Sequence, residues 1–445
     1  MSTRLFGTDG VRGHAGEWPL DPATIARLGA AVVRAQGLDR PVRLIVGRDT
    51  RESGGWIERE LARGAVSAGG VVTSAGVVPT PAIAYLAGVL DVDLGVVLSA
   101  SHNPFADNGV KVFSGHGRKF GEADERAVEQ IVADPSWTVP SGREVHVDHA
   151  PLVDRYLAHL EKILPSPGAL AGSRIAVDMA NGATTATARR ALEHLGLTVI
   201  ALGDAPDGRN INEGCGSTHP QHLAAKVVSD GCRLGVAFDG DGDRAILVDD
   251  SGRIVDGDAM MLVLALAYHR AGALTGNTVV ATVMSNIGLE IAMKRHGIML
   301  LRTPVGDKYV MEEMVRGGFV LGGEQSGHVI LSEHLHTGDG LATTLAILRV
   351  IAETGRELAD LASELVTYPQ TLVNVRVRER VPVDEVPAVQ SVIDRVLKAI
   401  NGKGRVLIRY SGTEPLLRIM IEGEEQTAVE RWAQDIAAAV KASLV

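Results

Sequence analysis

The chain has 445 residues, and its 44 Lys and Arg against 54 Asp and Glu give a net charge of −10 without any basic run. This charge argues against nucleic acid and anionic membranes as partners. With 45% hydrophobic and 22% charged residues, the composition excludes a disordered or fibrous protein, and the length predicts about three domains.

The sequence also bears on the compartment. Its two cysteines, Cys215 and Cys232, exclude a disulfide framework and favour the reducing cytosol. The longest nearly pure apolar stretch, 259–268, is shorter than a membrane helix requires, and the N-terminal residues lack the apolar core of a secretory signal. We therefore expect a cytoplasmic protein.

One order of strands and helices occurs three times along the chain. The first copy is expected as strands at 42–46, 70–74 and 94–98, with a helix at 56–68 and a Pro-rich loop with a helix before the last strand. The second is expected as strands at 175–178, 198–202 and 234–238, with a helix at 185–195. The third is expected as strands at 279–283, 298–302 and 318–321, with a helix at 288–296. This alternation predicts α/β layers with parallel strand pairing.

The last part of the chain has a different pattern. Residues 371–377 alternate, with Val373, Val375 and Val377 on one face, as in a half-buried strand. A helix at 389–400 that ends at Asn401-Gly402, strands at 405–408 and 418–421, and a helix at 427–442 are expected to follow. The fold class predicted is therefore three repeated α/β domains with mixed sheets (1–150, 151–255 and 256–367) and a C-terminal α+β domain (368–445).

The third strand of each copy ends in a polar loop that contains glycine or proline. Ordinary turns favour the same residues, so one such loop alone would indicate only a turn. Three equivalent loops with different reactive groups indicate function, because function collects beyond the carboxyl ends of strands in such sheets.

The loop after the second copy, Asp239-Gly-Asp-Gly-Asp243, has three carboxylates at alternate positions. Three like charges this close repel each other unless a cation is present, and the oxygen ligands suit a hard cation. An EF-hand calcium loop would need Gly at its sixth position and Glu at its twelfth, where this chain has Arg244 and Asp250. The sequence predicts magnesium bound by Asp239, Asp241 and Asp243.

The loop after the first copy, Ser99-Ala-Ser-His-Asn-Pro104, carries two hydroxyls and a histidine. From the residue types alone, this loop would be an ordinary turn with a serine that caps a helix and a turn proline. A hydrolase nucleophile elbow, Gly-x-Ser-x-Gly, is missing, and His102 is not expected to point its ring back at the preceding hydroxyl. A predicted magnesium site on the equivalent loop makes Ser101 a candidate for phosphoryl transfer instead.

Several cations could neutralise a phosphate. Arg12, Arg48, Arg51 and Lys111 lie in or near these loops, although each alone would ordinarily be a surface charge. The segment 409–418 differs, because Arg409 and Arg418 bracket Ser411, Gly412 and Thr413. Hydroxyl, backbone and guanidinium donors together suit one phosphate group.

These motifs together resemble the α-D-phosphohexomutase superfamily, most closely its bacterial phosphoglucosamine mutase branch. The resemblance covers the whole chain and its four signatures in order, and the opening Phe6-Gly-Thr-Asp-Gly-Val-Arg-Gly13 resembles the same branch. The signatures are Ser99-Ala-Ser-His-Asn-Pro104, Asp239-Gly-Asp-Gly-Asp-Arg244, Gly323-Glu-Gln-Ser-Gly-His328 and Arg409-Tyr-Ser-Gly-Thr-Glu-Pro415.

The resemblance implies four domains around a central cleft and a role for each signature. It implies that Ser101 carries a phosphoryl group that binds one Mg²⁺ together with the three aspartates. Lys111 and His328 resemble the proton-transfer groups, and Arg12 and Arg48 are expected near the transferring phosphate. The implied sugar-binding residues are Glu324 and Ser326, and the implied phosphate-binding residues are Arg409, Ser411, Gly412, Thr413 and Arg418.

The implied activity is an isomerase that interconverts glucosamine 6-phosphate and glucosamine 1-phosphate. The family reaction passes through a 1,6-bisphosphate, and its product leads to UDP-N-acetylglucosamine and the cell wall. A phosphoglucomutase or phosphomannomutase, and a sugar-phosphate binding protein without turnover, are the alternatives. A small sugar phosphate is the expected partner, and a homodimer is left open.

Overall fold

The computed structural model describes residues 4–7, 9–140, 147–166, 168–411 and 415–445. The chain divides into two compact units, which we describe separately. The core unit comprises residues 1–284 and 297–364, and the C-terminal unit comprises residues 285–296 and 365–445. Among the described residues, none of the helices is both long and apolar enough to cross a membrane.

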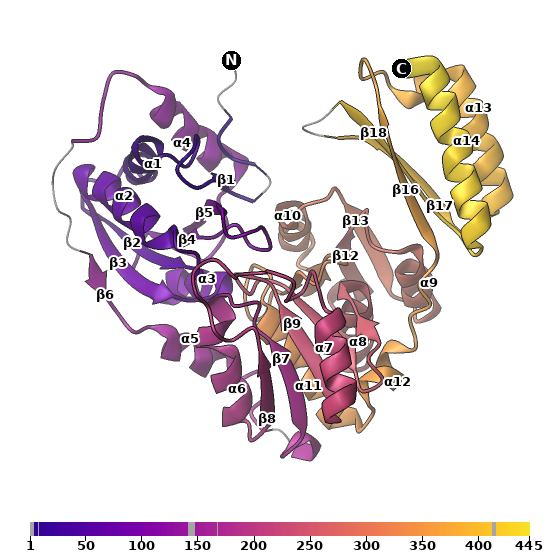
Figure 1. Cartoon of the computed structure of the whole chain (residues 1–445), viewed down its shortest axis with the longest axis horizontal. Coiled ribbons are helices and arrows are strands. Elements are labelled where there is room, and N and C mark those ends of the chain that lie inside the picture. Colours follow the sequence, from indigo (N-terminus) through magenta and orange to yellow (C-terminus); the bar gives the residue numbers. More distant parts are fainter. Residues whose placement is uncertain (1–3, 8, 141–146, 167, 412–414) are drawn as a thin grey trace. The chain divides into compact units, whose positions relative to one another are not determined.

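The first sheet of the core unit has six strands in the order β1-β5-β4-β2-β3-β6 (Figure 1). Its strands are β1 (Val11–His14), β2 (Val42–Arg48), β3 (Gly70–Val77), β4 (Leu94–Leu98), β5 (Asp107–Ser114) and β6 (Asp148–His149). Its helices are α1 (Pro22–Arg34), α2 (Gly54–Ser67), α3 (Thr80–Val89) and α4 (Glu122–Ala133).

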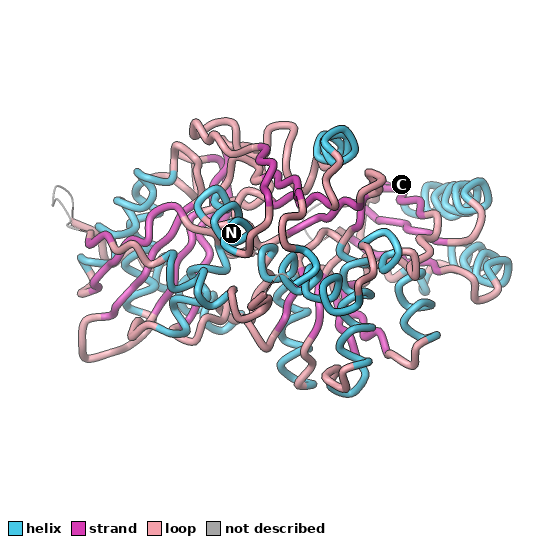
Figure 2. Tube along the Cα trace, turned by 90° about the horizontal axis from the view of Figure 1, so that it is seen from below, coloured by secondary structure: helices cyan, strands magenta, loops and turns pink. Residues whose placement is uncertain are grey.

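Helices cover both faces of this sheet, as the layers in Figure 2 show. Alternate residues of β2 point to opposite faces. Leu44 and Val46 pack in one apolar cluster with residues of α1, α2 and α4. On the other face, a Cβ at Gly47 would lie 2.6 Å from the Ile83 side chain of α3. Burial on both faces explains why β4 and residues 44–46 of β2 are apolar.

The second sheet has five strands in the order β11-β10-β9-β7-β8, and the third has four in the order β13-β12-β14-β15. Strands and helices of the second part are α5 (Val153–Leu160), β7 (Arg174–Asp178), α6 (Ala188–His194), β8 (Thr198–Leu202), α7 (Gln221–Asp230), β9 (Leu234–Phe238), β10 (Ala245–Asp249) and β11 (Ile254–Val255). Those of the third are α8 (Gly257–Arg270), β12 (Thr278–Thr282), β13 (Met299–Thr303), α10 (Asp307–Gly317), β14 (Leu321–Gly323), β15 (Val329–Leu331), α11 (Gly340–Thr354) and α12 (Leu358–Ala362).

The three sheets share one arrangement of strands. In each, the first predicted strand lies between the second and the third, and all three are parallel. The chain then turns back from the third strand into an antiparallel neighbour, which is β5, β10 or β15. The threefold repeat is therefore visible in the topology, and the sheets are mixed because of these return strands.

Two predicted elements differ from the structure by more than the position of an end: one is displaced and one is divided. The strand expected at 318–321 is β14 at Leu321–Gly323, because α10 continues to Gly317 and ends at Gly318, which adopts a left-handed φ of 64°. The helix expected at 185–195 is divided into a short 3-10 turn, Ala183–Ala186, and α6. Thr187 separates them with a non-helical φ of −131°.

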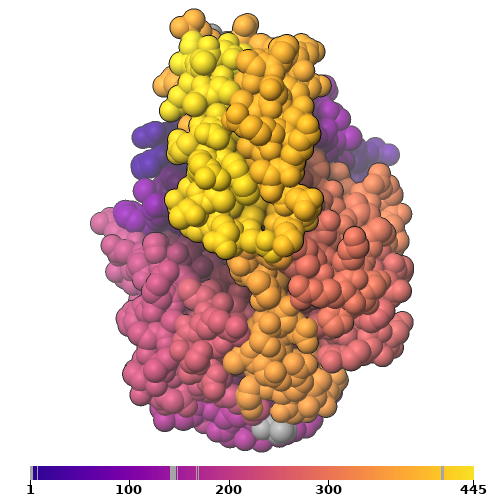
Figure 3. Space-filling model, turned by 90° about the vertical axis from the view of Figure 1, so that its right-hand side faces the viewer, coloured from indigo at the N-terminus to yellow at the C-terminus, as the bar shows by residue number. Residues whose placement is uncertain are grey.

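The C-terminal unit contains a three-stranded antiparallel sheet in the order β16-β18-β17. Its strands and helices are α9 (Ile287–Arg295), β16 (Gln370–Arg376), α13 (Pro387–Ile400), β17 (Arg405–Tyr410), β18 (Leu416–Glu422) and α14 (Gln426–Leu444). Val375 and Val377 are buried as their alternation predicts, and Asn401 ends α13 in a left-handed conformation. Helices α13 and α14 lie side by side, with their outer surface visible in Figure 3. The α+β character predicted for the tail is confirmed.

Candidate active site

The three equivalent loops of the core unit come together at the ends of their third strands. Ser101 lies between β4 and β5, the aspartates lie between β9 and β10, and His328 precedes β15. The Ala245 amide donates to the Gly327 carbonyl at 3.1 Å, and a Cβ at Gly327 would lie 2.0 Å from the Ala245 carbonyl. Gly327 has φ 91°, so both the conformation and the close approach require glycine.

Ser101 is buried and held in a left-handed conformation with φ 55°. Its hydroxyl donates to Asp239 Oδ2 at 2.5 Å, and its backbone amide donates to Ser99 Oγ at 2.9 Å. Ser99 Oγ in turn donates to Asp49 Oδ2 at 2.6 Å. These hydrogen bonds hold the Ser101 hydroxyl in a fixed position against the acidic loop.

The expectation for the His102 ring is wrong. His102 Nδ1 lies 3.3 Å from the Ser101 hydroxyl, because the left-handed turn at Ser101 brings the neighbouring ring back. Burial, together with the charges of Arg244 and Arg12, lowers the pKa of His102 to about 4. The ring is therefore neutral at physiological pH.

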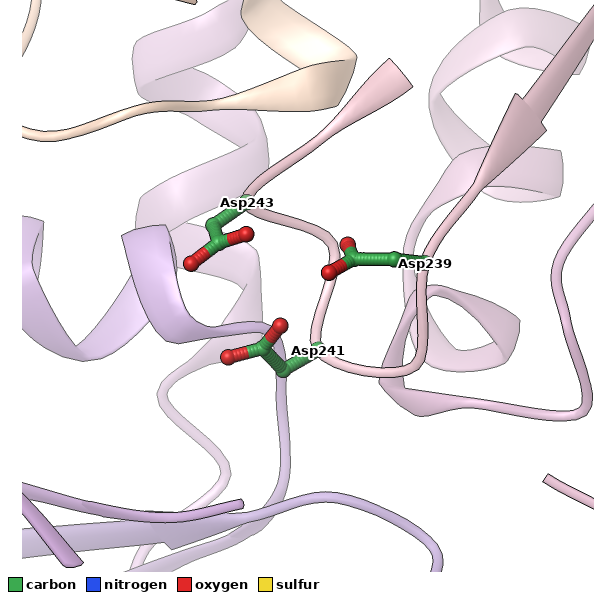
Figure 4. Close-up of side chains that lie close together, drawn as sticks. All are labelled: Asp239, Asp241 and Asp243. Carbon is green, nitrogen blue, oxygen red and sulfur yellow. The ribbon is translucent and has the colours of Figure 1, made fainter. Parts of the chain in front are cut away.

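The three aspartates of the loop between β9 and β10 point toward one another (Figure 4). Oxygen atoms of Asp239, Asp241 and Asp243 lie within 4.8 Å of each other, and all three residues are buried. Burial and the two neighbouring carboxylates raise the pKa of Asp239 well above its usual value. Without a cation, burial and repulsion therefore disfavour the charged form of Asp239, and a bound cation would allow all three carboxylates to be ionised.

Lys111 supplies part of the countercharge. It lies on β5 opposite Val97 of β4, so the return strand carries it back to the loops. Its Nζ lies 2.8 Å from Asp241 and 3.1 Å from Asp243, and 3.0 Å from Asp9. Burial would lower the pKa of Lys111, but these carboxylates raise it well above its usual value, so the amine is protonated.

The same contacts lower the pKa of Asp243. Burial would raise it, but Lys111 and then His328 lower it well below its usual value. His328 Nδ1 lies 3.6 Å from Asp243 Oδ1, and its Nε2 accepts a hydrogen bond from the Gly338 amide at 3.0 Å. In the neutral ring the proton therefore resides on Nδ1.

The acidic loop fits a divalent cation. Within the described part of the chain, Asp241 Oδ1 and Asp243 Oδ1 are buried without a hydrogen-bond partner. One lysine cannot balance three carboxylates, and Ser101 Oγ offers a further oxygen beside Asp239. An oxygen-only set with unsatisfied carboxylate atoms is typical of a Mg²⁺ site.

A cavity of about 350 Å³ is lined by Asp243 of the acidic loop and by His328, and its size lies in the range of small-molecule sites. Arg12 and Arg244 line it, and the Nε atoms of both are buried without a hydrogen-bond partner among the described residues. Two such guanidinium donors indicate that the cavity takes an anion. Its lining residues are Leu5, Gly7, Asp9, Gly10, Arg12, His102, Asp243, Arg244, Val305, Gly306, Asp307, Glu324 and His328.

The two predicted sugar-binding residues differ in position. Glu324 lines the cavity, and its Oε1 accepts a hydrogen bond from the Gly306 amide at 3.2 Å. Ser326 is exposed, and its hydroxyl is 3.5 Å from Glu324 Oε2. Arg48 is not among the lining residues, and it pairs with Glu58 at 3.0 Å.

The arginines of the predicted phosphate loop lie on the C-terminal unit. Arg409 of β17 is directly opposite Arg418 of β18, and Ser411, at the end of β17, is buried. Burial and the neighbouring Arg418 charge lower the pKa of Arg409. Gly412 and Thr413 lie outside the described residues.

Four charged residues of the site were missed in the sequence. Asp9 pairs with Arg12, Lys111 and Lys119, and Lys119 also pairs with Asp307. Asp9 and Arg12 both lie in the opening segment 6–13, so the resemblance of that segment could have indicated Asp9. Arg244, also missed, closes the aspartate signature. Lys119 and Asp307 carry no local signal in the sequence.

Family models match four successive parts of the chain. All four describe phosphoglucomutase/phosphomannomutase, and they match its domain I at residues 3–138, domain II at 154–252, domain III at 256–368 and C-terminal domain at 372–439.

Curated relatives match over the full length. The phosphoglucosamine mutase of Desulfovibrio desulfuricans is 46% identical, with 100% of both chains covered. That of Moorella thermoacetica is 48% identical, covering 96% of this chain and 97% of the relative.

Solved structures show the same fold. A phosphoglucomutase/phosphomannomutase family protein from Burkholderia thailandensis has a TM-score of 0.80 at 26% identity, with 99% and 98% of the two chains covered. An N-acetylphosphoglucosamine mutase from Aspergillus fumigatus, solved with GlcNAc-6P and magnesium, has a TM-score of 0.69 at 18% identity and coverages of 99% and 96%.

Proposed function

Because the chain belongs to the phosphoglucomutase/phosphomannomutase family, we propose that it is a phosphoglucosamine mutase, an isomerase of glucosamine 6-phosphate and glucosamine 1-phosphate. The observation that carries the proposal is the hydrogen bond from the buried Ser101 hydroxyl to Asp239, beside a protonated lysine. We assign glucosamine as the sugar because the full-length relatives of 46% and 48% identity are phosphoglucosamine mutases.

The proposed reaction transfers one phosphoryl group twice. Phosphorylated Ser101 gives its phosphoryl group to the free hydroxyl of glucosamine 6-phosphate, which forms a 1,6-bisphosphate. The bisphosphate then reverses its orientation, and the phosphoryl group from C6 returns to Ser101. Glucosamine 1-phosphate is released and the phosphoserine is regenerated, so phosphate and charge balance over the cycle.

The acidic loop would hold Mg²⁺. Asp239, Asp241 and Asp243, with the phosphate on Ser101, would be its ligands, and the bound ion would neutralise charge on the transferring phosphoryl group. The A. fumigatus structure, which contains magnesium and a sugar phosphate, supports this assignment by analogy of fold.

Side chains around the cavity would assist the transfer. Protonated Lys111 would stabilise the phosphate and donate a proton, and His328 would exchange a proton with the substrate hydroxyl. Arg12 lines the cavity and would contact the phosphate directly. Arg48 is paired with Glu58, so we assign it to the surroundings of that phosphate.

The remaining site residues would bind the substrate away from the reacting phosphate. Glu324 and Ser326 would accept and donate hydrogen bonds to sugar hydroxyls. On the C-terminal unit, Arg409, Ser411, Gly412, Thr413 and Arg418 would bind the other phosphate. Charged and hydroxyl donors of this kind bind a phosphate in either orientation of the sugar, as the reversal requires.

The wider context stays a prediction. Domain boundaries after residues 150, 255 and 367, a cytoplasmic location and supply of UDP-N-acetylglucosamine are expected from sequence and family resemblance, and a homodimer is left open. The chain's small-molecule partner would be the sugar phosphate.

A coupled assay tests the proposal. With Mg²⁺ and a trace of hexose 1,6-bisphosphate, we expect turnover of glucosamine 6-phosphate to exceed that of glucose and mannose phosphates. Preference for glucose or mannose phosphate would make the chain a phosphoglucomutase or phosphomannomutase. Binding of all three without turnover would leave a sugar-phosphate binding protein.

A further inference from the structure

Among the described residues of the core unit, Arg51 has the largest fully buried side chain, contrary to the expectation that it is an ordinary surface charge. Its guanidinium is paired with Asp49 through Nε at 2.8 Å, and both side chains have no exposed surface. Arg51 is not among the residues that line the cavity beside Asp243, so its burial needs another explanation, because removing a charge from water is costly.

The remaining donors of Arg51 all bind the loop that carries Ser101. Nη2 donates to the Ser101 carbonyl at 3.0 Å and the Asn103 carbonyl at 2.8 Å. Nη1 donates to the Asp107 carbonyl at 2.9 Å and to the Pro104 carbonyl. All five N–H groups of the side chain are thereby used, four of them on one backbone segment.

Asp49 connects the same arginine to the other side of the nucleophile. Its Oδ2 accepts hydrogen bonds from Arg51 Nε and from Ser99 Oγ, and Ser99 Oγ accepts the Ser101 amide. The backbone of Ser101 is therefore bound at its N–H through Ser99 and Asp49, and at its carbonyl by Arg51. Such a double attachment explains how a non-glycine residue keeps φ 55°.

A second donor reaches this carbonyl from the part of the core unit that carries the metal loop. Asn212 Nδ2 donates to the Ser101 carbonyl at 2.9 Å and the Asn103 carbonyl at 3.1 Å. Gly240 of the acidic loop packs on the same atoms, since a Cβ there would lie 2.6 Å from the Ser101 carbonyl and 2.8 Å from Asn212 Nδ2. The contacts that orient Ser101 therefore also fix it relative to Asp239.

We propose that Arg51, assisted by Asn212, is a positioning residue for phosphoryl transfer: it fixes the 101–107 backbone so that Ser101 Oγ faces the acidic loop. The inference rests on the proposed function, because it assigns the residue to that reaction. Arg51 would touch neither substrate nor metal, and would act only through the backbone of the nucleophile loop.

The test compares Arg51→Lys with a matched control, Arg27→Lys. Arg27 also binds carbonyls of a distant segment, those of Val132, Asp134 and Trp137, but away from the three loops. Lysine keeps the charge and loses the forked set of donors. We expect Arg51→Lys to lower kcat about 100-fold with KM changed less than about threefold, because small misplacements of a reacting group have effects of that order. Arg27→Lys should lower the melting temperature and leave kcat unchanged.

Asn212→Ala provides a second variant if Arg51→Lys does not fold. It should lower kcat about tenfold, and hydrogen exchange of the 99–107 amides should become faster in both variants but not in Arg27→Lys. Unchanged kcat and exchange in Asn212→Ala and in folded Arg51→Lys would overturn the proposal. If the wild-type protein shows no turnover of sugar phosphates, the proposed function fails, whereas the exchange measurement still decides whether Arg51 fixes the loop.

Discussion

Two regions of the molecule concentrate charge of one sign, and they do so differently. In the loop between β9 and β10, three buried aspartates stand beside one lysine, and two of their oxygen atoms have no hydrogen-bond partner among the described residues. On the C-terminal unit, Arg409 and Arg418 are half-buried and directly opposite each other on antiparallel strands. Like charges in that position destabilise a sheet.

The difference between the two regions lies in burial. The acidic loop is shielded from water and already bound to Ser101 and Lys111, so a cation added there would interact strongly. The arginine pair is partly exposed, where solvent weakens each interaction. We therefore expect changes in the acidic region to abolish turnover and changes in the basic region to weaken binding.

The largest effect is expected for Ser101→Ala. Removing the hydroxyl removes the group that would carry the phosphoryl, and mutase activity should fall by roughly 10⁴-fold or more while the fold is kept. Intact-mass analysis of the wild-type protein, followed by peptide mapping, should find partial phosphorylation at Ser101. A phosphate mainly on Ser99 would contradict the assignment, since Ser99 Oγ is already bound to Asp49.

The second-largest loss of activity is expected for Asp241→Asn. Loss of one carboxylate should weaken Mg²⁺ binding and lower activity by at least about 100-fold, and excess Mg²⁺ should restore part of it. Titration calorimetry with Mg²⁺ and activity against Mg²⁺ concentration would measure both. Asp250→Asn, an exposed carboxylate near the same sheet, is the control. Full activity of the wild-type protein in a strong chelator would exclude the metal site.

Much of the fold could be predicted because its central strands are apolar. β4 and β9 have the bounds expected from sequence, since burial on both faces requires continuous apolar runs. The return strands β5 and β10 were not predicted. They carry polar residues at buried positions, such as Lys111 and Asp249, and these interrupt the hydrophobic pattern.

The site could be predicted only where its residues are close in sequence. The spacing of the three aspartates indicates the metal site, because one tight loop brings Asp239, Asp241 and Asp243 together. Lys119 and Asp307 are separated by 188 positions, and Arg51 and Ser101 by 50, so their pairing depends on the packing of different elements. Hydrophobic periodicity contains no information on such contacts.

Arg418→Ala tests the basic region. Loss of a charge-assisted hydrogen bond of roughly 1.5–3 kcal/mol should raise KM for both the 6-phosphate and the 1-phosphate about 10- to 100-fold. Turnover at saturation should change less, and more 1,6-bisphosphate should escape. Arg376→Ala, an exposed arginine on the neighbouring β16, should leave KM unchanged. Steady-state kinetics in both directions measures these changes. Equal KM values for the wild type and Arg418→Ala would show that Arg418 does not bind the substrate phosphate.

The smallest effect is expected at Asp339, a buried carboxylate whose hydrogen-bond donors among the described residues are neutral. It caps α11 through the Ala342 amide and accepts the Tyr156 hydroxyl at 2.9 Å. Burial raises the pKa of Asp339 to about 6 from 3.8. The folded chain thus binds more protons than the unfolded chain between about pH 4 and 6, so this group lowers stability as pH rises through that window.

Asp339→Asn should remove that pH dependence. An amide keeps an oxygen for the cap and carries no charge, so the variant should gain stability relative to wild type as pH rises from 4 to 7. Two pKa units correspond to roughly 3 kcal/mol. We expect a smaller gain in the free energy of unfolding, about 1 kcal/mol at pH 7.5. The gain is reduced because the amide nitrogen forces the Tyr156 hydroxyl to accept a hydrogen bond instead of donating one. Thermal unfolding at pH 4.5 and 7.5 measures the difference in stability between Asp339→Asn and the wild type, with Asp39→Asn at an exposed position as control. An equal difference at both pH values would mean that Asp339 is charged in the fold, and that burial alone does not separate it from the aspartates of the acidic loop.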